Sequence, residues 1–269
     1  MESTEIKKGK TTEKEIQICH HGREVYGIAT MPAGSGRVPM VIFSHGYNGT
    51  LDNFKRYVDF LAKLGIGTVR YDFCGGAVCS KSSMATTDMT VLTEKQDLEA
   101  VFDTVAGWER TDTDRLFLFG ESQGGLVSAL AADGLEERLR GLALLYPALC
   151  IEEHWMERFQ KEEDIPEKVD FMGMLLGRKF FTSLRGLDTF SHIGRFRGPV
   201  LIMHGDKDEM VPLSYSERAA ELYPDASLKV FPQEGHGFTE KAEKQVMEML
   251  WEMLAGCIMP VGNGSEVGK

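Results

Sequence analysis

Residues 116–132 read LFLFGESQGGLVSALAA, and this stretch decides the fold. Its first four residues are apolar and predict a buried strand, while the small and apolar residues 125–132 predict a helix. Between them stands Gly120-Glu121-Ser122-Gln123-Gly124, a G-x-S-x-G motif. A strand, a sharp turn and a helix in this order hold the serine in a strained conformation that exposes its hydroxyl, and the glycines admit close neighbours. We therefore predict that Ser122 is a nucleophile; the alternative is a turn softened by glycine.

Further apolar runs predict the other strands of one mostly parallel sheet. They lie at 40–44, 67–73, 142–146, 200–203 and 228–231, and near-continuous apolar strands are typical of sheets buried on both faces. Between several of these runs the apolar residues follow the 3.6-residue spacing of helices, which indicates βαβ units. Residues 15–19 and 24–31 are expected to form an antiparallel hairpin at the sheet edge. The predicted fold class is α/β, with helices on both faces.

One stretch interrupts this alternation and predicts an inserted cap. Residues 152–196 are rich in charged, aromatic and methionine residues. Their aromatic side chains either line a pocket or pack the insertion onto the body. We therefore divide the chain into a core, residues 15–151 and 197–255, and a cap, residues 152–196. Residues 1–14 and 256–269 are expected to be a flexible N-terminus and a flexible tail.

Length and charge limit the classes of function. A chain of 269 residues can bury a substantial core in one large domain. Its 41 acidic and 30 basic residues give a net charge of −11, which argues against nucleic acid and anionic membranes as partners. Residues 1–15 are polar and lack the apolar region typical of a signal peptide. The longest apolar stretches are much shorter than the roughly 20 residues that a membrane-spanning helix needs. Its five cysteines include no C-x-x-C pair, so neither a disulfide framework nor a zinc knuckle is indicated, and we expect a cytoplasmic protein. We expect its chemistry to use neither metal nor cofactor.

A serine nucleophile requires a base to take its proton and an acid to orient that base. In folds of this type the acid and then the histidine follow the serine, on loops after later strands. His236, within Glu234-Gly235-His236-Gly237-Phe238, directly follows the last apolar strand and is the predicted base. The other histidines precede Ser122, lie in the insertion or close a strand ahead of the candidate acids: His20, His21, His45, His154, His192 and His204.

The acid is expected in the loop after residues 200–203. This loop offers Asp206, Asp208 and Glu209, and spacing alone does not decide among them. Asp206 directly follows a glycine and is well placed to brace the turn with its own side chain. Asp208 lies further along, where its carboxylate can reach another loop, and we favour it as the acid.

Acyl transfer also needs two backbone N–H donors for the developing oxyanion. One is expected to be the N–H of Gln123, the residue after the nucleophile. The other is expected from the loop after residues 40–44, which reads His45-Gly46-Tyr47-Asn48-Gly49, and we assign it to Tyr47. His45 then has a structural role.

Together these motifs resemble the serine α/β-hydrolase superfamily, and the resemblance covers nearly the whole chain. Within it the chain is most similar to bacterial cinnamoyl and feruloyl esterases. The motifs that carry the likeness are residues 44–49 (SHGYNG), 70–73 (RYDF), 120–125 (GESQGG), 204–212 (HGDKDEMVP) and 235–237 (GHG). The resemblance implies that Asp208 is the acid, that Tyr47 and Gln123 supply the oxyanion amides, and that the insertion contacts an aromatic acyl group.

The sequence departs from the pattern of these esterases after residues 70–73. A Gly-x-Gly-x-Ser turn is usual there, whereas this chain reads Cys74-Gly75-Gly76-Ala77-Val78-Cys79-Ser80. Because this turn lies near the site, the departure leaves the three catalytic positions intact but weakens the transfer of hydroxycinnamate specificity.

The sequence therefore predicts a serine carboxylic-ester hydrolase that acts on small aromatic or short-chain esters, of the feruloyl type. One alternative is a monoacylglycerol lipase or acyl-peptidase of the same fold, and another is a binding protein that kept the fold and lost the reaction. The expected partner is a small-molecule ester. Whether the chain forms a homodimer stays open, because apolar periodicity does not distinguish an exposed patch from the core.

Overall fold

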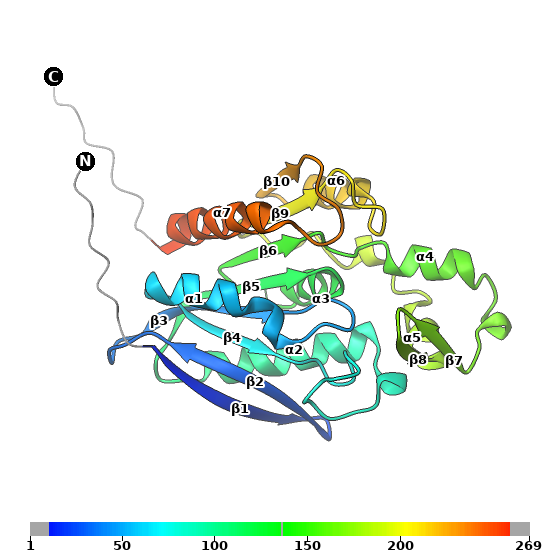
Figure 1. The fold of residues 1–269 in the computed structure, drawn as a ribbon, viewed down its shortest axis with the longest axis horizontal. Helices are drawn as coiled ribbons and strands as arrows, with labels where there is room; N and C mark the ends of the chain where they lie inside the picture. Colours follow the sequence, from blue (N-terminus) through cyan, green and yellow to red (C-terminus); the bar gives the residue numbers. More distant parts are fainter. Residues whose placement is uncertain (1–10, 136, 259–269) are drawn as a thin grey trace.

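The computed structural model describes residues 11–135 and 137–258. Its main sheet has eight strands in the order β1-β2-β4-β3-β5-β6-β9-β10 (Figure 1). β2 is antiparallel to β1 and to β4, and the remaining neighbours are parallel. The strands are β1 (Thr12–His20), β2 (Arg23–Met31), β3 (Val38–Ser44), β4 (Gly67–Tyr71), β5 (Thr111–Glu121), β6 (Gly141–Leu145), β9 (Val200–Gly205) and β10 (Ala226–Phe231). The predicted α/β class, with a mostly parallel sheet and an antiparallel N-terminal hairpin, is confirmed.

The hairpin and the last helix extend beyond their predicted boundaries. β1 begins at Thr12, which pairs with Met31 of β2, so residues 12–14 belong to the sheet and not to a flexible N-terminus. Backbone pairing in a hairpin needs no apolar side chain, and these exposed residues therefore gave no apolar signal. Helix α7 (Glu240–Ile258) likewise includes residues 256–258, which the sequence assigns to the tail. The remaining terminal predictions, for residues 1–10 and 259–269, lie outside the described residues.

Helices cover both faces of the sheet and enclose two apolar cores. On one face, α1 (Lys55–Lys63) and α7 pack against one set of alternate strand residues, such as Phe43 and Phe119. On the other face, α2 (Val91–Ala106), α3 (Gln123–Ala132) and α6 (Leu213–Leu222) pack against the intervening residues, such as Ile42 and Leu118. This two-sided burial is the reason that the strands read as continuous apolar runs.

The segment between β6 and β9 lies beyond the carboxyl ends of β5 and β6 (Figure 1). It contains α4 (Ile151–Arg158), the antiparallel pair β7 (Lys168–Phe171) and β8 (Met174–Gly177), and α5 (Arg178–Leu184). Short 3₁₀ helices are η1 (Leu51–Phe54), η2 (Thr86–Asp88), η3 (Glu162–Asp164) and η4 (Thr189–Ser191). We keep the name cap for residues 152–196.

Aromatic side chains hold the cap together. Trp155 of α4 has its ring 4.8 Å from that of Phe181 and 5.2 Å from that of Phe171, and Phe181 also packs on Phe159. Phe181 is fully buried and belongs to the main core, so these contacts also fasten the cap to the body. Within the described ranges, no helix combines the length and apolar character needed to cross a membrane.

Candidate active site

Ser122 stands at the turn between β5 and α3 with a backbone φ of 52°. Such a positive φ is strained for a residue with a side chain. The neighbouring chain stabilises it: the Ser122 N–H donates to the carbonyl of Leu145 at 3.0 Å, and the Ser122 carbonyl accepts the N–H of Ala148 at 2.9 Å. The end of β6 therefore holds the serine in place from the adjacent strand.

The two glycines of the motif are required by close packing. A Cβ added to Gly120 would overlap the carbonyl oxygen of Gly124 and lie 2.6 Å from Ser128 Oγ. A Cβ added to Gly124 would overlap the carbonyl oxygens of Ser44 and His45. The turn can therefore bring α3 against β5 and β3 only because neither glycine has a side chain.

Gly120→Ala is expected to lower the free energy of unfolding by about 3 kcal/mol, because the new methyl group forces backbone atoms apart in a packed core. Urea unfolding measures the change. Gly134→Ala is the matched control, since its added Cβ meets Ala131 O at an ordinary 3.6 Å. Equal unfolding free energies for the two variants would contradict the claim that close packing at Gly120 excludes a side chain.

The structure brings together the three side chains that the sequence singled out. Ser122 Oγ lies 2.8 Å from His236 Nε2, and His236 Nδ1 lies 2.7 Å from Asp208 Oδ2. The loops after β5, β9 and β10 supply them, so they meet at the carboxyl edge of the sheet. The ring of Tyr146 packs against that of His236 with centroids 4.8 Å apart. In this arrangement His236 Nε2 can take the serine proton while Nδ1–H donates to Asp208.

The surroundings of Asp208 favour its ionised form. Burial alone would raise the pKa of this carboxyl, but hydrogen bonds from His204, His236 and the N–H of Val211 hold the pKa well below its usual range. The side chain is fully buried, and its Oδ1 accepts the N–H groups of Met210 and Val211 at 3.0 and 2.8 Å. Asp208 is therefore a fixed anion beside His236.

Asp206 and Glu209, the alternatives to Asp208, are exposed in the same loop. Asp206 Oδ1 accepts the backbone N–H of Gln233 at 2.7 Å and thereby ties the loop after β9 to the loop after β10. Its carboxylate braces the turns, as its position after a glycine suggested. The structure places Asp208, and neither of the other two, against His236.

Two other histidines near the site, His45 and His204, are buried and lie within hydrogen-bonding distance of neighbouring residues. His45 is buried, with Nδ1 2.8 Å from Gly46 O while Nε2 accepts the N–H of Phe73 at 3.0 Å. Burial lowers the pKa of His45, so the ring stays neutral. His204 Nε2 lies 3.3 Å from Asp208 Oδ2, and its Nδ1 lies 2.7 Å from Ser216 Oγ. Sequence reasoning missed this contact between His204, at the end of β9, and Asp208 in the following loop, although their four-residue spacing was a signal.

The two predicted oxyanion donors lie next to the serine. Gln123 directly follows it, and the loop that carries Tyr47 passes so close that a Cβ on Gly46 would lie 3.1 Å from Ser122 Cβ. Within the described part of the chain, the N–H groups of Tyr47 and Gln123 donate to no other residue. Both N–H groups are therefore unpaired close to Ser122, as oxyanion donors need to be.

The loop of Tyr47 is held by the turn in which the sequence departs from the esterase pattern. Gly76 O accepts the N–H of Asn48 at 3.0 Å, and Asn48 Oδ1 accepts the N–H of Val78 at 3.0 Å. On the cap side, the hydroxyl of Tyr47 donates to Phe171 O at 2.8 Å. The altered turn thus supports the loop beside the serine, and Tyr47 also connects this loop to the cap.

A buried carboxyl, Glu94 of α2, lies behind Gln123. Its Oε2 accepts the side-chain amide of Gln123 at 2.7 Å, and both residues are almost fully buried. Burial raises the pKa of Glu94 to about 8. Glu94 is therefore mostly neutral at pH 7 and adds little negative charge behind Gln123.

Glu94→Gln is expected to reduce the pH dependence of stability. The folded pKa of Glu94, about 8, lies above its ordinary 4.5, so the native state keeps a proton that the unfolded chain releases between these values. This contribution to stability is full below the ordinary pKa and is lost as the pH rises to about 8. Glutamine does not titrate, so the fall in unfolding free energy between about pH 5 and pH 8 should be smaller in the variant, as measured by urea unfolding. An equal fall in unfolding free energy with pH in the variant and the wild type would contradict this prediction. Glu109→Gln, at an exposed position, is the control.

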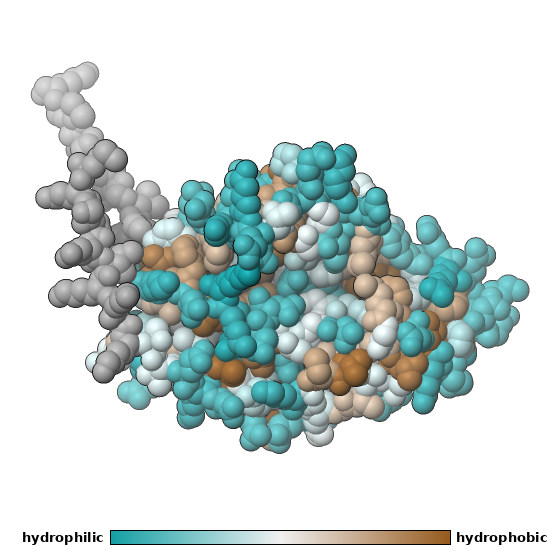
Figure 2. All heavy atoms as spheres, in the orientation of Figure 1, coloured by the Kyte–Doolittle hydropathy of each residue, from teal (hydrophilic) through white to brown (hydrophobic). Residues whose placement is uncertain are grey.

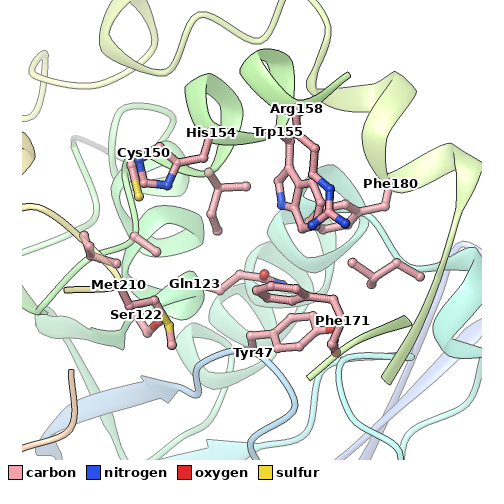
Figure 3. A pocket seen from close by; sticks show the side chains of 14 residues that line it. Tyr47, Ser122, Gln123, Cys150, His154, Trp155, Arg158, Phe171, Phe180 and Met210 are labelled. Carbon is pink, nitrogen blue, oxygen red and sulfur yellow. The ribbon is translucent and has the colours of Figure 1, made fainter. Parts of the chain in front are cut away.

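A cavity of about 210 Å³ opens in front of Ser122, between the core and the cap (Figure 3). Its walls include Tyr47, Ser122, Trp155, Arg158, Phe171 and Phe180. Benzene occupies cavities of about 150 Å³, so this one has room for a single ring with a few further atoms. Cys150 also lines it, but burial raises the pKa of its thiol to about 12, so the thiol stays protonated at neutral pH.

One cluster outside the cavity has the composition of a metal site. His20, Cys74 and Asp97 place their ligand atoms within 4.8 Å of one another. However, Asp97 Oδ1 already lies 3.1 Å from Arg23 Nε, and Asp97 Oδ2 accepts the N–H of Cys74 at 2.8 Å. A guanidinium so close opposes a second cation, and these contacts fit a structural ion pair between β2 and α2.

Comparison with known proteins gives two matching sequence families. The family described as serine aminopeptidase, S33, matches residues 37–169, and the family described as alpha/beta hydrolase fold matches residues 168–241. Palmitoyl-protein thioesterase ABHD10 of Mus musculus is 26% identical over 77% of this chain and 72% of that protein. Esterase EstD of Thermotoga maritima is 28% identical over 69% of this chain, but the match spans only half of EstD.

Among solved structures, Est1E from Butyrivibrio proteoclasticus with bound ferulic acid superimposes with a TM-score of 0.80. It is 26% identical, and the match covers 89% of this chain and 99% of Est1E. Mouse alpha/beta hydrolase domain-containing protein 10 gives a TM-score of 0.74 at 21% identity, over 90% of this chain and 99% of that one. The predicted resemblance near bacterial feruloyl esterases is confirmed.

Proposed function

We propose that this chain, which belongs to the α/β-hydrolase superfamily, is a serine hydrolase of carboxylic esters that works through an acyl-enzyme. The observation that carries the proposal is the continuous chain of hydrogen-bonding distances from Ser122 Oγ to His236 Nε2, 2.8 Å, and from His236 Nδ1 to Asp208 Oδ2, 2.7 Å. These distances suit the three roles of a serine hydrolase, with Ser122 as nucleophile, His236 as base and Asp208 as acid.

Acylation begins when His236 takes the proton of Ser122 and the serine oxygen attacks the ester carbonyl. The carbonyl electrons move to its oxygen, and the N–H groups of Tyr47 and Gln123 stabilise the resulting oxyanion. The oxyanion then collapses, the bond to the alcohol breaks, and His236 gives its proton to the departing alkoxide. Asp208 stabilises the imidazolium that exists between these two proton transfers.

Deacylation repeats the same steps with water. His236 takes a proton from the water molecule, the hydroxide attacks the acyl-enzyme, and the same N–H groups bind the second oxyanion. The proton returns from His236 to Ser122 Oγ as the acid leaves. The residues therefore return to their starting state, and the proposed cycle uses neither metal nor organic cofactor.

For the substrate we propose a small aromatic or short-chain ester of the hydroxycinnamoyl type. The support is twofold: aromatic residues of the cap, Trp155, Phe171 and Phe180, line the cavity in front of Ser122, and the similar Est1E binds ferulic acid. A planar acyl group would gain both apolar burial and ring contacts between these side chains.

A panel of substrates tests this proposal. It comprises methyl ferulate, p-nitrophenyl butyrate, a monoacylglycerol, an acyl-peptide and a palmitoyl thioester, each followed by kcat/KM. The last two are included because a family of serine aminopeptidases and a thioesterase match the chain. We expect the highest kcat/KM for methyl ferulate or the short ester. A preference for the thioester or the peptide would overturn the substrate class, and no turnover of any would favour the binding-protein alternative.

A further inference from the structure

The walls of the cavity carry an unusual charge. Of the described residues that line it, none is an aspartate or a glutamate, and one is an arginine, Arg158. The chain as a whole has 41 acidic and 30 basic residues. A cavity with a cation and without a carboxylate therefore differs from the average surface of this protein, and it attracts anions.

Arg158, in the last turn of α4, has no polar partner among the described residues. Its guanidinium lies over the rings of Trp155 and Phe159, 5.3 and 5.6 Å from their centres. The three other arginines of the cap are engaged: Arg178 donates to Glu162 O at 2.7 Å, Arg185 to Phe159 O at 2.6 Å, and Arg195 to Asp133 Oδ2 at 3.2 Å. Arg158 is exposed, and it packs over these rings while its N–H donors stay available.

Arg158 and Ser122 lie at different ends of the cavity. Figure 3 shows Ser122 beside Met210, and Arg158 with Trp155 and Phe180 on the opposite side. The ring of Phe171 lies between these groups in the same view. An acyl group that presents its carbonyl to Ser122 and its ring to Phe171 would therefore direct its distal substituent toward Arg158.

We propose that Arg158 forms an anion-binding subsite, so that the enzyme prefers esters whose acyl group carries a carboxylate at its distal end. The inference rests on the proposed ester hydrolysis and adds the charge of the substrate to it. A guanidinium binds a carboxylate through two parallel N–H···O bonds. The aromatic rings supply the apolar contacts for the part of the acyl group between the two ends.

The test compares two esters of the same shape, methyl 4-carboxycinnamate and methyl 4-carbamoylcinnamate. We expect wild-type protein to favour the carboxylate, and Arg158→Gln to lower the ratio of the two kcat/KM values by about tenfold, mainly through KM. Comparing ratios between proteins cancels the intrinsic difference in reactivity of the two esters. Arg158→Lys should keep part of the preference, because it keeps the charge but loses the planar fork.

Arg115→Gln is the matched control. It removes the same charge from a half-buried side chain in the first half of β5, before the buried part of that strand that leads to Ser122. We expect it to keep the wild-type ratio. An unchanged ratio in Arg158→Gln, with the carbamoyl ester still hydrolysed, would overturn the subsite and leave the proposed function intact.

If the wild type hydrolyses neither ester, measurements of ester binding still test the Arg158 subsite separately from the proposed ester hydrolysis. Calorimetry of the 4-carboxy ester with Ser122→Ala should show binding about tenfold tighter than with Ser122→Ala/Arg158→Gln. Such a difference in affinity, together with no turnover by the wild type, would support the anion-binding subsite at Arg158 and overturn the proposed ester hydrolysis. Equal binding to both proteins would overturn the subsite itself.

Discussion

Ser122→Ala is expected to lower kcat for ester hydrolysis by up to about a millionfold. The serine oxygen is the atom that forms the proposed acyl-enzyme, and His236 has no proton to take once this oxygen is absent. The residues of such a unit act together, so the loss of one removes nearly the whole chemical contribution. The remaining rate, from binding and oxyanion stabilisation, should still exceed that of the uncatalysed reaction. Initial rates with methyl ferulate or p-nitrophenyl butyrate measure the change.

Ser227→Ala is the control for this substitution. Ser227 is an exposed residue of β10, and its alanine variant should retain the wild-type rate. Circular dichroism and the midpoint of thermal unfolding establish that Ser122→Ala is folded. Near-normal turnover by folded Ser122→Ala would rule out a mechanism through this serine.

Asp208→Asn is expected to lower kcat by about ten-thousandfold. The carboxylate accepts from His236 Nδ1 at 2.7 Å and thereby keeps Nε2 free to take the serine proton. An amide in its place can donate to Nδ1 and so stabilise the wrong tautomer, and it also removes the negative charge beside the imidazolium. The pKa of Asp208 is held well below its usual range by its hydrogen bonds, so this charge is present throughout the neutral pH range.

Asp206→Asn provides a matched control two residues away. It makes the same chemical change in the same loop, but the Asp206 carboxylate accepts the backbone N–H of Gln233. An asparagine oxygen can accept the same bond, so we expect a rate within about threefold of the wild type. Similar losses in both variants would indicate a general disturbance of the loop and would contradict the specific role of Asp208.

Much of the fold could be predicted from the sequence because its signals are local. The buried strands read as apolar runs, and the motif around Ser122 places a strand before the turn and a helix after it. The boundaries at the two ends were less accurate, since residues 12–14 pair through their backbone without an apolar side chain. A helix such as α3 was also visible, because its small residues suit a position buried on every side.

The candidate site was harder to complete because its contacts join distant parts of the chain. Spacing left Asp206, Asp208 and Glu209 as alternatives, and only the positions of the loops after β9 and β10 place Asp208 against His236. The pairing of Glu94 with Gln123 joins residues 29 positions apart. Likewise, nothing in the sequence distinguishes Arg158 from the other charged residues of its segment, because its proposed role depends on which side chains surround it.

Labelling with a fluorophosphonate probe, followed by peptide mass spectrometry, tests the central claim most directly. We expect one adduct on Ser122 in the wild-type protein, none in Ser122→Ala, and slower labelling in Asp208→Asn. An unlabelled Ser122 in folded wild-type protein, or equal labelling rates with and without Asp208, would contradict the activation of this serine by its two partners.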